Sequence, residues 1–282
     1  MSDVVKQTYD RWARGEGMGD DSWGDLTAEP EGVDYLAVEA GGVPAMWIDP
    51  RGVARDRVIV ALHGGGFVGG SLATHRKLYG HLAKAAGNRA LLVDYRLAPG
   101  HVYPAQLEDA ITAYQWVTEQ GLATALSGDS SGGGLCVAAA LRAAELGLPM
   151  PAALLLMSPW VDMELTGSGY ETNAGTDLVF TRSMVQGLAD IYLSGGASAD
   201  DPLANPLRAD LTGLPPMFVQ VGGAESLLTD SRLLAARARE AGVLVRLDEF
   251  PGQLHTFQMA AGRTAVADDA IGRFAGWLRP RF

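Results

Sequence analysis

Short apolar segments alternate with amphipathic helical segments through most of this 282-residue chain. The apolar segments have the length of strands and lie between turn signals, whereas the helical segments repeat apolar residues at a period near 3.6. This alternation is typical of a parallel sheet whose strands are joined by crossover helices, so we predict an α/β fold with about eight strands. The predicted strands are 33–40, 43–49, 57–62, 90–95, 124–129, 152–158, 217–222 and 243–250, of which the first two form an antiparallel hairpin.

Helical patterns separate these strands until residue 160, where the rhythm breaks. The next part, 160–214, has turn signals, one helical piece and no clear strand, and so long an insertion is usually a lid or binding element. The predicted helices are 75–86, 106–120, 133–146, 182–193, 231–241 and 264–278. The predicted division is an N-terminal cap segment at 1–30, an α/β core at 31–159 and 215–282, and a helical cap insertion at 160–214.

Charge and composition exclude several classes of partner. The formal net charge is −11 and the isoelectric point is near 4.8, whereas nucleic acids and anionic membranes require a basic face. No window approaches the roughly 18 consecutive apolar residues of a membrane span. The single cysteine, Cys136, rules out an internal disulfide framework, and the N-terminus lacks the apolar stretch of a secretory signal. We therefore predict a cytoplasmic protein that binds a small neutral or apolar molecule.

The glycine-rich stretch LHGGGFVGGS fits two kinds of site. Gly64, Gly66 and Gly69 have the spacing G-x-G-x-x-G after an apolar strand, and Asp94 ends the next strand, as in a dinucleotide-binding fingerprint. A dinucleotide site, however, needs its glycine loop to run directly into a helix that receives the pyrophosphate. Here several residues intervene, and the helical pattern starts only near His75. The alternative is a bent loop whose backbone N–H groups stabilise a transient oxyanion.

The segment GDSSGGG contains the only G-x-S-x-G of the chain, with Ser130 at its centre. It follows an apolar strand and precedes a helical run, which is the strand-turn-helix context of a nucleophilic serine. Such a turn holds the serine in a strained backbone conformation and needs small neighbours, which Gly128 and Gly132 supply. A serine-rich helix N-cap is the alternative, but pattern and context together favour a nucleophile.

A serine hydroxyl is a weak nucleophile at neutral pH and needs an adjacent base that is oriented by an acid. In this type of fold the order along the chain is serine, acid, histidine. His255 directly follows the last predicted strand and is the only histidine after Ser130, so it is the predicted base. Glu225 lies at the end of the strand at 217–222 and is the predicted acid. Asp230 is interpreted as the N-cap of the following helix and is kept as the alternative acid.

Five motifs follow one another from about residue 57 to the C-terminus: HGGGF, DYRLAPGHVYPAQLEDA, GDSSGG, VGGAESLLTD and HTF. This ordered set resembles the bacterial esterases of the hormone-sensitive lipase family, within the α/β-hydrolase fold. The resemblance implies a capped enzyme that cleaves carboxylic esters of short to medium acyl chains, with Ser130, Glu225 and His255 as its triad. Two positions depart from the family pattern: Glu225-Ser-Leu replaces Asp-Pro-Leu, and Gly100 replaces a glutamate in the motif that contains Arg96.

The glycine loop gains a role in this interpretation. Gly64 and Gly65 offer N–H groups to the oxyanion, Gly66 is a third candidate, and the amide of Ser131 adds another donor. His63 is expected to brace the loop through its side chain. No metal or organic cofactor is implied.

The expected partner is a small ester or lactone, and three questions stay open. A lactone hydrolase using the same site and a catalytically silent binding protein of the same fold are the alternative functions. A homodimer through the last strand is an option that the resemblance suggests. His75, His81 and His101 show no metal-ligand spacing and are expected to cap, pack or face water. The candidate lining of an acyl pocket is Trp12, Met18, Phe67, Trp160, Phe180 and Tyr192.

Overall fold

One eight-stranded sheet runs through the protein, whose computed structural model describes residues 3–16, 23–177 and 179–282. The strands are β1 (Val33–Ala40), β2 (Val43–Pro50), β3 (Arg57–Leu62), β4 (Arg89–Val93), β5 (Ala123–Asp129), β6 (Leu154–Met157), β7 (Met217–Gly222) and β8 (Val245–Phe250). Their order is β1-β2-β4-β3-β5-β6-β7-β8; β2 pairs antiparallel with β1 and β4, and the other pairs are parallel. The predicted fold class, with eight mostly parallel strands, is confirmed.

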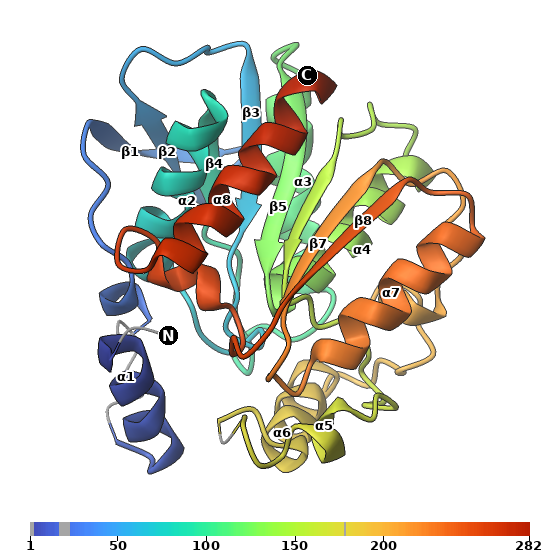
Figure 1. Cartoon of the computed structure of the whole chain (residues 1–282). Helices are drawn as coiled ribbons and strands as arrows, with labels where there is room; N and C mark the ends of the chain where they lie inside the picture. The colour runs from blue at the N-terminus through green and yellow to red at the C-terminus, as the bar shows by residue number, and fades with distance from the viewer. Residues whose placement is uncertain (1–2, 17–22, 178) are drawn as a thin grey trace.

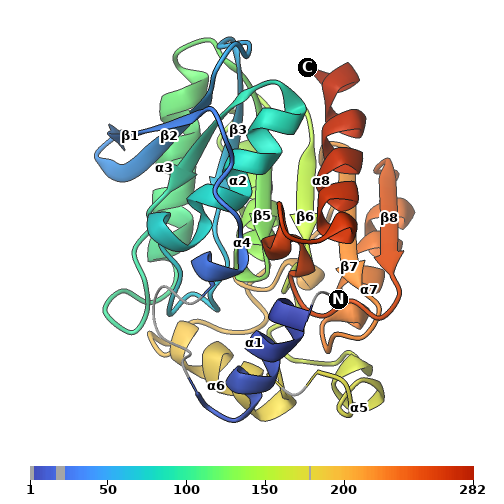
Figure 2. The same cartoon turned by 60° about the vertical axis from the view of Figure 1, so that its left-hand side comes forward.

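Helices cover both faces of this sheet. α2 (Leu72–Ala86) packs against α8 (Ala265–Leu278) on one face, and α3 (Ala105–Thr118) packs against α4 (Ser131–Glu145) on the other (Figures 1 and 2). α7 (Leu228–Glu240) packs against β7 and β8. Because the central strands are covered on both sides, β5, β6 and β7 are buried almost throughout, which explains their continuous apolar runs.

A second group of helices lies at the end of the sheet where the parallel strands finish. Figures 1 and 2 show α1 (Asp3–Ala13), α5 (Gly169–Thr172) and α6 (Arg182–Tyr192) together at this end, although α1 is far from the other two in sequence. α6 matches the predicted helix of the insertion. The sequence pattern missed α5, because a single helical turn is too short to show a 3.6-residue period.

Two helices start three residues earlier than predicted. α2 begins at Leu72 rather than near His75, because Ser71 caps it: the Ser71 hydroxyl accepts the N–H of Thr74, and the Thr74 hydroxyl accepts the N–H of Ser71. The N-terminus of this helix therefore already has its own cap. α7 begins at Leu228, so Asp230 lies inside its first turn and is not the N-cap that the sequence suggested.

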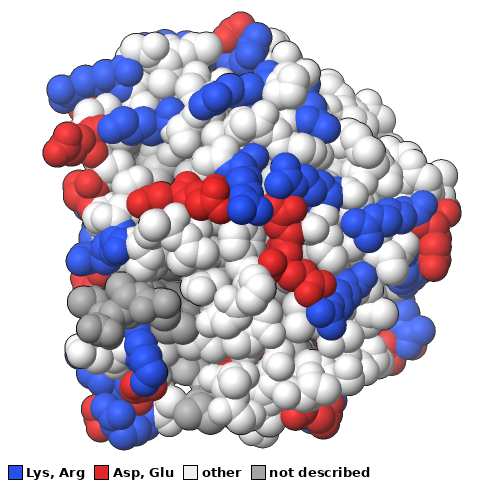
Figure 3. Space-filling model, viewed as in Figure 1, with Lys and Arg blue, Asp and Glu red and all other residues white. Residues whose placement is uncertain are grey.

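Charges of both signs are mixed on the surface. On the face seen in Figure 3, Lys and Arg lie beside Asp and Glu rather than forming a single-sign patch. Ion pairs near the edge strand β8 follow the same pattern, since Asp248 pairs with both Arg246 and Arg273. Among the residues that the structure describes, no helix is long and apolar enough to cross a membrane.

We expect Gly132→Ala to lower the free energy of unfolding by about 3 kcal/mol, because the added methyl group has no space. A Cβ on Gly132 would lie 2.0 Å from the carbonyl oxygen of Leu62, which is backbone in β3 and has little freedom to move. Gly272→Ala is the matched control: nothing lies within 4 Å of that Cβ in α8, so stability should rise by up to about 1 kcal/mol. Urea unfolding followed by circular dichroism measures both changes. Equal stabilities of the two variants would contradict the close packing of α4 on β3.

Candidate active site

Ser130 occupies the sharp turn between β5 and α4, with φ 54° and ψ −124°. Residues other than glycine rarely adopt positive φ, so this backbone is strained. The neighbouring glycines make the turn possible, since a Cβ on Gly128 would lie 2.2 Å from the carbonyl oxygen of Gly132. The turn presents the Ser130 side chain to a cavity at the carboxyl end of the sheet.

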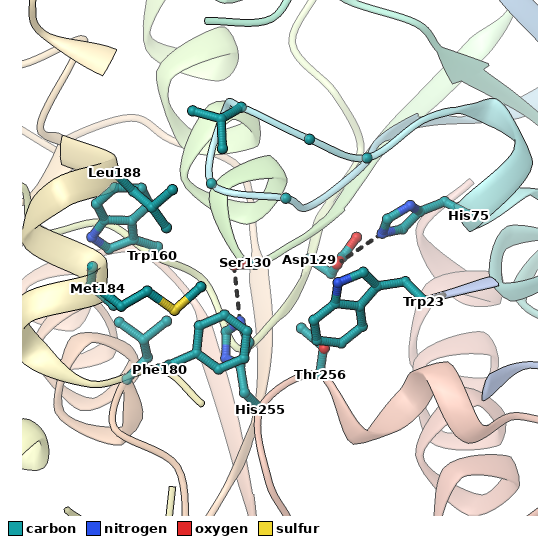
Figure 4. Close-up of a pocket in the computed structure, with 17 residues that line it drawn as sticks. Trp23, His75, Asp129, Ser130, Trp160, Phe180, Met184, Leu188, His255 and Thr256 are labelled. Carbon is teal, nitrogen blue, oxygen red and sulfur yellow. Dashed lines mark hydrogen bonds and ion pairs between the residues drawn. The ribbon is translucent and has the colours of Figure 1, made fainter. Parts of the chain in front are cut away.

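Three predicted residues form one chain of hydrogen bonds. The Oγ of Ser130 lies 2.9 Å from Nε2 of His255, and Nδ1 of His255 lies 3.0 Å from Oε1 of Glu225 (Figure 4 shows the first of these contacts). Glu225 and His255 are fully or almost fully buried, whereas Ser130 is 8% exposed at the cavity. Loops after three different strands therefore bring together a hydroxyl, an imidazole and a carboxylate in the geometry of a nucleophile, a base and an orienting acid.

The carboxylate of Glu225 is also held from behind. Its Oε2 accepts hydrogen bonds from the hydroxyl of Ser158, at 2.7 Å, and from the N–H of Gly222, at 2.8 Å. Glu225 stands just after β7, so the longer glutamate side chain reaches His255 while its second oxygen stays bound at the end of that strand. The departure from aspartate at this position therefore leaves the acid in contact with the imidazole.

Asp230 has a different environment. Its Oδ2 accepts the N–H groups of Val161 and Asp162, and the structure shows no contact between it and His255. Burial, together with the nearby Asp162, raises the pKa of Asp230 well above its ordinary value. This carboxyl group therefore binds the backbone at the start of the insertion, and it is not placed to orient the imidazole.

The glycine loop supplies N–H groups, but not all of the predicted ones. The N–H of Gly64 donates to Oδ1 of Asp129 at 3.0 Å, so the prediction of Gly64 as an oxyanion donor is wrong: its hydrogen is already taken. Gly65 and Gly66 line the cavity beside Ser130. Within the described residues, the N–H groups of Gly65, Gly66 and Ser131 have no acceptor. These three amides are the ones left to bind an oxygen of a ligand.

His63 lies beneath this loop and is fully buried. Its Nδ1 donates to the carbonyl oxygen of Gly64 at 2.8 Å, and its ring stacks on Tyr95 at a centroid distance of 4.2 Å. The hydroxyl of Tyr95 donates to the carbonyl oxygen of His63 at 2.6 Å. Burial, with His75 nearby, lowers the pKa of His63 to about 3, so the ring is neutral at pH 7. His63 and Tyr95 therefore hold the glycine loop in place from below.

Asp129 and His75 form a buried polar pair that the sequence did not reveal. Oδ2 of Asp129 lies 3.3 Å from Nε2 of His75, and the hydroxyl of Tyr79 donates to the other carboxylate oxygen at 3.2 Å. Although burial raises the pKa of Asp129, His75 and the bond from Gly64 bring it below its ordinary value. The sequence signal that could have indicated this pair is Asp129 itself, an acidic residue at the end of a predicted buried strand. His75 was expected to cap, pack or face water; it is buried and lines the cavity.

Arg96 keeps an acidic environment although Gly100 replaces the glutamate of the family motif. Its Nε lies 2.9 Å from Oδ2 of Asp109, and its Nη2 lies 3.1 Å from Glu108. Both carboxylates belong to α3, so this helix supplies the local network.

A cavity of about 250 Å³ adjoins Ser130 and has mostly apolar walls. Figure 4 shows Met184 and Leu188 on one side of Ser130 and Trp23 on the other, with Phe180 beside His255. Two of the predicted lining residues, Trp160 and Phe180, contact the cavity. Trp23, Met184 and Leu188 were missed, because isolated apolar residues in a cap look the same in sequence whether they line a cavity or only pack.

Three other predicted lining residues lie elsewhere. Phe67 and Tyr192 stack on each other behind the wall, with ring centroids 3.9 Å apart, and are almost completely buried. Trp12 is buried against Trp23, at a centroid distance of 4.4 Å, and supports that side chain rather than the cavity itself. Met18 lies outside the described residues. Among the residues that are described, no group of three or more His, Cys, Asp or Glu side chains is arranged to hold a metal ion.

Comparison with known proteins places this geometry in a family. The family model of the alpha/beta hydrolase fold matches residues 59–259. An acetyl-hydrolase of Streptomyces hygroscopicus is 36% identical over 256 residues, which cover 87% of this chain and 83% of that protein. An esterase of Acinetobacter venetianus is 38% identical over 222 residues, covering 78% and 73% of the two chains.

A solved structure extends the similarity to the whole chain. It is an esterase from the bacterial hormone-sensitive lipase family, which superposes with a TM-score of 0.94 at 39% identity and covers 100% of this chain and 99% of its own. This superposition covers the whole chain, whereas the family match begins at residue 59. The chain therefore belongs to the α/β-hydrolase fold family, among the bacterial esterases related to hormone-sensitive lipase.

Proposed function

We propose that this protein is a carboxylesterase that cleaves esters of short to medium acyl chains through an acyl-enzyme on Ser130. Family membership and the esterase relatives support ester hydrolysis. The observation that carries the finer proposal is the continuous hydrogen-bonded chain from Ser130 through His255 to Glu225. This chain opens on a mostly apolar cavity near three amides that have no acceptor among the described residues. The divided core of 31–159 and 215–282, capped by 1–30 and 160–214, belongs to the same proposal.

The chemistry follows from the positions of the atoms. The Oγ of Ser130 attacks the ester carbonyl carbon while Nε2 of His255 takes its proton, and Glu225 holds the Nδ1–H of the imidazole. The N–H groups of Gly65, Gly66 and Ser131 receive the oxyanion. The bond to the alkoxide then breaks, and His255 returns the proton to that leaving group. Water then attacks the acyl carbon while His255 takes its proton. The bond from that carbon to Oγ breaks, His255 returns the proton to Ser130, and the carboxylic acid leaves.

The walls of the cavity select the substrate. Trp23, Phe180 and Met184 offer apolar contacts, and a volume of about 250 Å³ suits a small uncharged ester. A lactone presents the same carbonyl chemistry in a ring. Turnover of matched linear esters and ring lactones, over a series of acyl lengths, compares the two substrate classes.

Reaction with a fluorophosphonate is expected to modify this protein at Ser130 alone. Phosphonylation needs the activated hydroxyl but no particular acyl or alcohol group, so it tests the nucleophile independently of the natural substrate. Intact-mass measurement and peptide mapping report the adduct and its position, and protein unfolded in urea serves as the unreactive control. Absence of an adduct from the folded protein would favour the alternative of a catalytically silent binding protein.

A further inference from the structure

The peptide group that joins His255 to Thr256 is held at both of its polar ends. Its carbonyl oxygen, on His255, accepts a hydrogen bond from the hydroxyl of Tyr9. Its N–H, on Thr256, donates to the hydroxyl of Ser158 at 3.2 Å. The two hydroxyls come from elements 246 and 98 residues away in sequence, and neither takes part in the proton transfers described above. We call this arrangement the histidine clamp.

The backbone at this point requires such support. Thr256 has φ 49° and ψ 39°, the left-handed conformation that costs free energy for a β-branched residue. The fixed carbonyl and N–H belong to the peptide group that precedes Thr256. They therefore set the direction in which the imidazole of His255 projects from the backbone. A displacement of the base by a fraction of an ångström weakens both its bond to Ser130 and its bond to Glu225.

Ser158 links the clamp to the acid. Its hydroxyl hydrogen goes to Oε2 of Glu225, at 2.7 Å, while its oxygen accepts the N–H of Thr256. A single hydroxyl therefore fixes the carboxylate and the backbone of the base relative to each other. Ser158 itself stands at φ 47° directly after β6, and its N–H is bound to the carbonyl oxygen of Gln220 in β7.

Tyr9 links the clamp to the N-terminal helix. Its ring is 4% exposed and packs against Trp12 and Trp23, at centroid distances of 5.2 and 6.2 Å. Burial raises the pKa of the Tyr9 hydroxyl, which keeps this group a neutral donor. Trp23 also lies 6.0 Å from Phe180, whose ring is 4.3 Å from that of His255. The helix α1 therefore reaches the base by a hydrogen bond and by a path of aromatic contacts.

We propose that Tyr9 and Ser158 are positioning residues for His255, so that the contact of α1 with the loop of His255 sets the geometry of the base. This proposal rests on the proposed function, because it assigns His255 the role of base. It adds that an element at the far N-terminus, outside the α/β core, controls the rate of the chemical step.

The test replaces each hydroxyl without removing the side chain that carries its packing. Tyr9→Phe is expected to lower kcat on a short aryl ester by about tenfold, with KM changed by less than about twofold, because the cavity walls stay in place. Ser158→Ala should lower kcat at least as much, since it also removes one of the two hydrogen bonds that Oε2 of Glu225 accepts. The double variant should lose less than the product of the single losses, because both changes act on one peptide group.

Tyr114→Phe is the matched control. The buried Tyr114 hydroxyl also donates to a backbone carbonyl, that of Pro149 at 2.5 Å, but it lies on α3 away from the cavity. Both variants are measured under conditions in which circular dichroism shows them folded. Equal losses of kcat in Tyr114→Phe and Tyr9→Phe would then mean that the Tyr9 hydroxyl contributes only to stability, which would contradict the clamp. A kcat equal to that of the unmodified protein, in Tyr9→Phe or in Ser158→Ala, would overturn the proposal that these residues position His255.

A second readout does not depend on turnover. The proton between Nδ1 of His255 and Glu225 should give a low-field NMR signal, which we expect to broaden or vanish in Tyr9→Phe but to persist in Tyr114→Phe and in Ser130→Ala. An unaltered signal in Tyr9→Phe contradicts the clamp. Failure of the unmodified protein to hydrolyse any ester contradicts the proposed function instead, so the two failures are distinguishable.

Discussion

Replacing Ser130 with alanine is expected to lower kcat on a short-chain aryl ester by about 10⁵- to 10⁶-fold, which leaves only the catalysis that amides and binding provide. The loss is this large because Ser130 is the only group at the end of the hydrogen-bonded chain that can form the acyl-enzyme. The fold should tolerate the change, since alanine keeps the Cβ and removes a hydroxyl whose contact is Nε2 of His255. Steady-state kinetics with a sensitive fluorogenic ester measure the effect.

Ser127→Ala provides the matched control for that result. Ser127 lies three positions earlier in β5, is fully buried, and its hydroxyl has no partner among the described residues. The same chemical change there should leave kcat unaltered and stability equal or slightly higher, because no hydrogen bond is lost. Near-normal turnover by Ser130→Ala would exclude the acyl-enzyme mechanism.

The parts of the structure that could be predicted from sequence are those that local pattern determines. Strands β5 to β7 are covered on both faces, so nearly all of their residues are buried and their sequences are continuous apolar runs. The ends of such runs could be located to within a few residues. The turn at Ser130 is recognisable because its steric limits demand glycine at fixed positions. His255 followed from the strand order, since it was the only histidine in the required place.

The parts that could not be predicted depend on contacts between distant segments. Whether an amide of the glycine loop is free or taken is decided by Asp129, which lies 65 residues from Gly64 and gives no sign of its partner in sequence. The contact of Tyr9 with the loop of His255 spans 246 residues. Periodicity likewise does not tell a residue that lines a cavity, such as Met184, from one that only packs.

Replacing Glu225 with glutamine is expected to lower kcat by about 10⁴-fold while the fold is kept. The direction of the new amide decides the effect. Gly222 donates its N–H to one oxygen of Glu225, at 2.8 Å, so the glutamine carbonyl must face Gly222 and its NH₂ must face His255. Nδ1 of the imidazole then accepts a hydrogen bond, and the proton moves to Nε2, which can no longer take one from Ser130. Steady-state kinetics should show a lower kcat with KM little changed.

Asp230→Asn removes an acid of similar burial and tests the alternative assignment directly. Burial raises the pKa of Asp230, and an asparagine oxygen can accept the N–H groups of Val161 and Asp162 as Oδ2 of Asp230 does. Its NH₂ group would take the place of Oδ1, which has no partner among the described residues. We therefore expect kcat to change by less than about threefold in this variant. The reverse pattern, with Glu225→Gln active and Asp230→Asn inactive, would make Asp230 the acid. It would require a rearranged active site, because of these two acids it is Glu225 that contacts the imidazole.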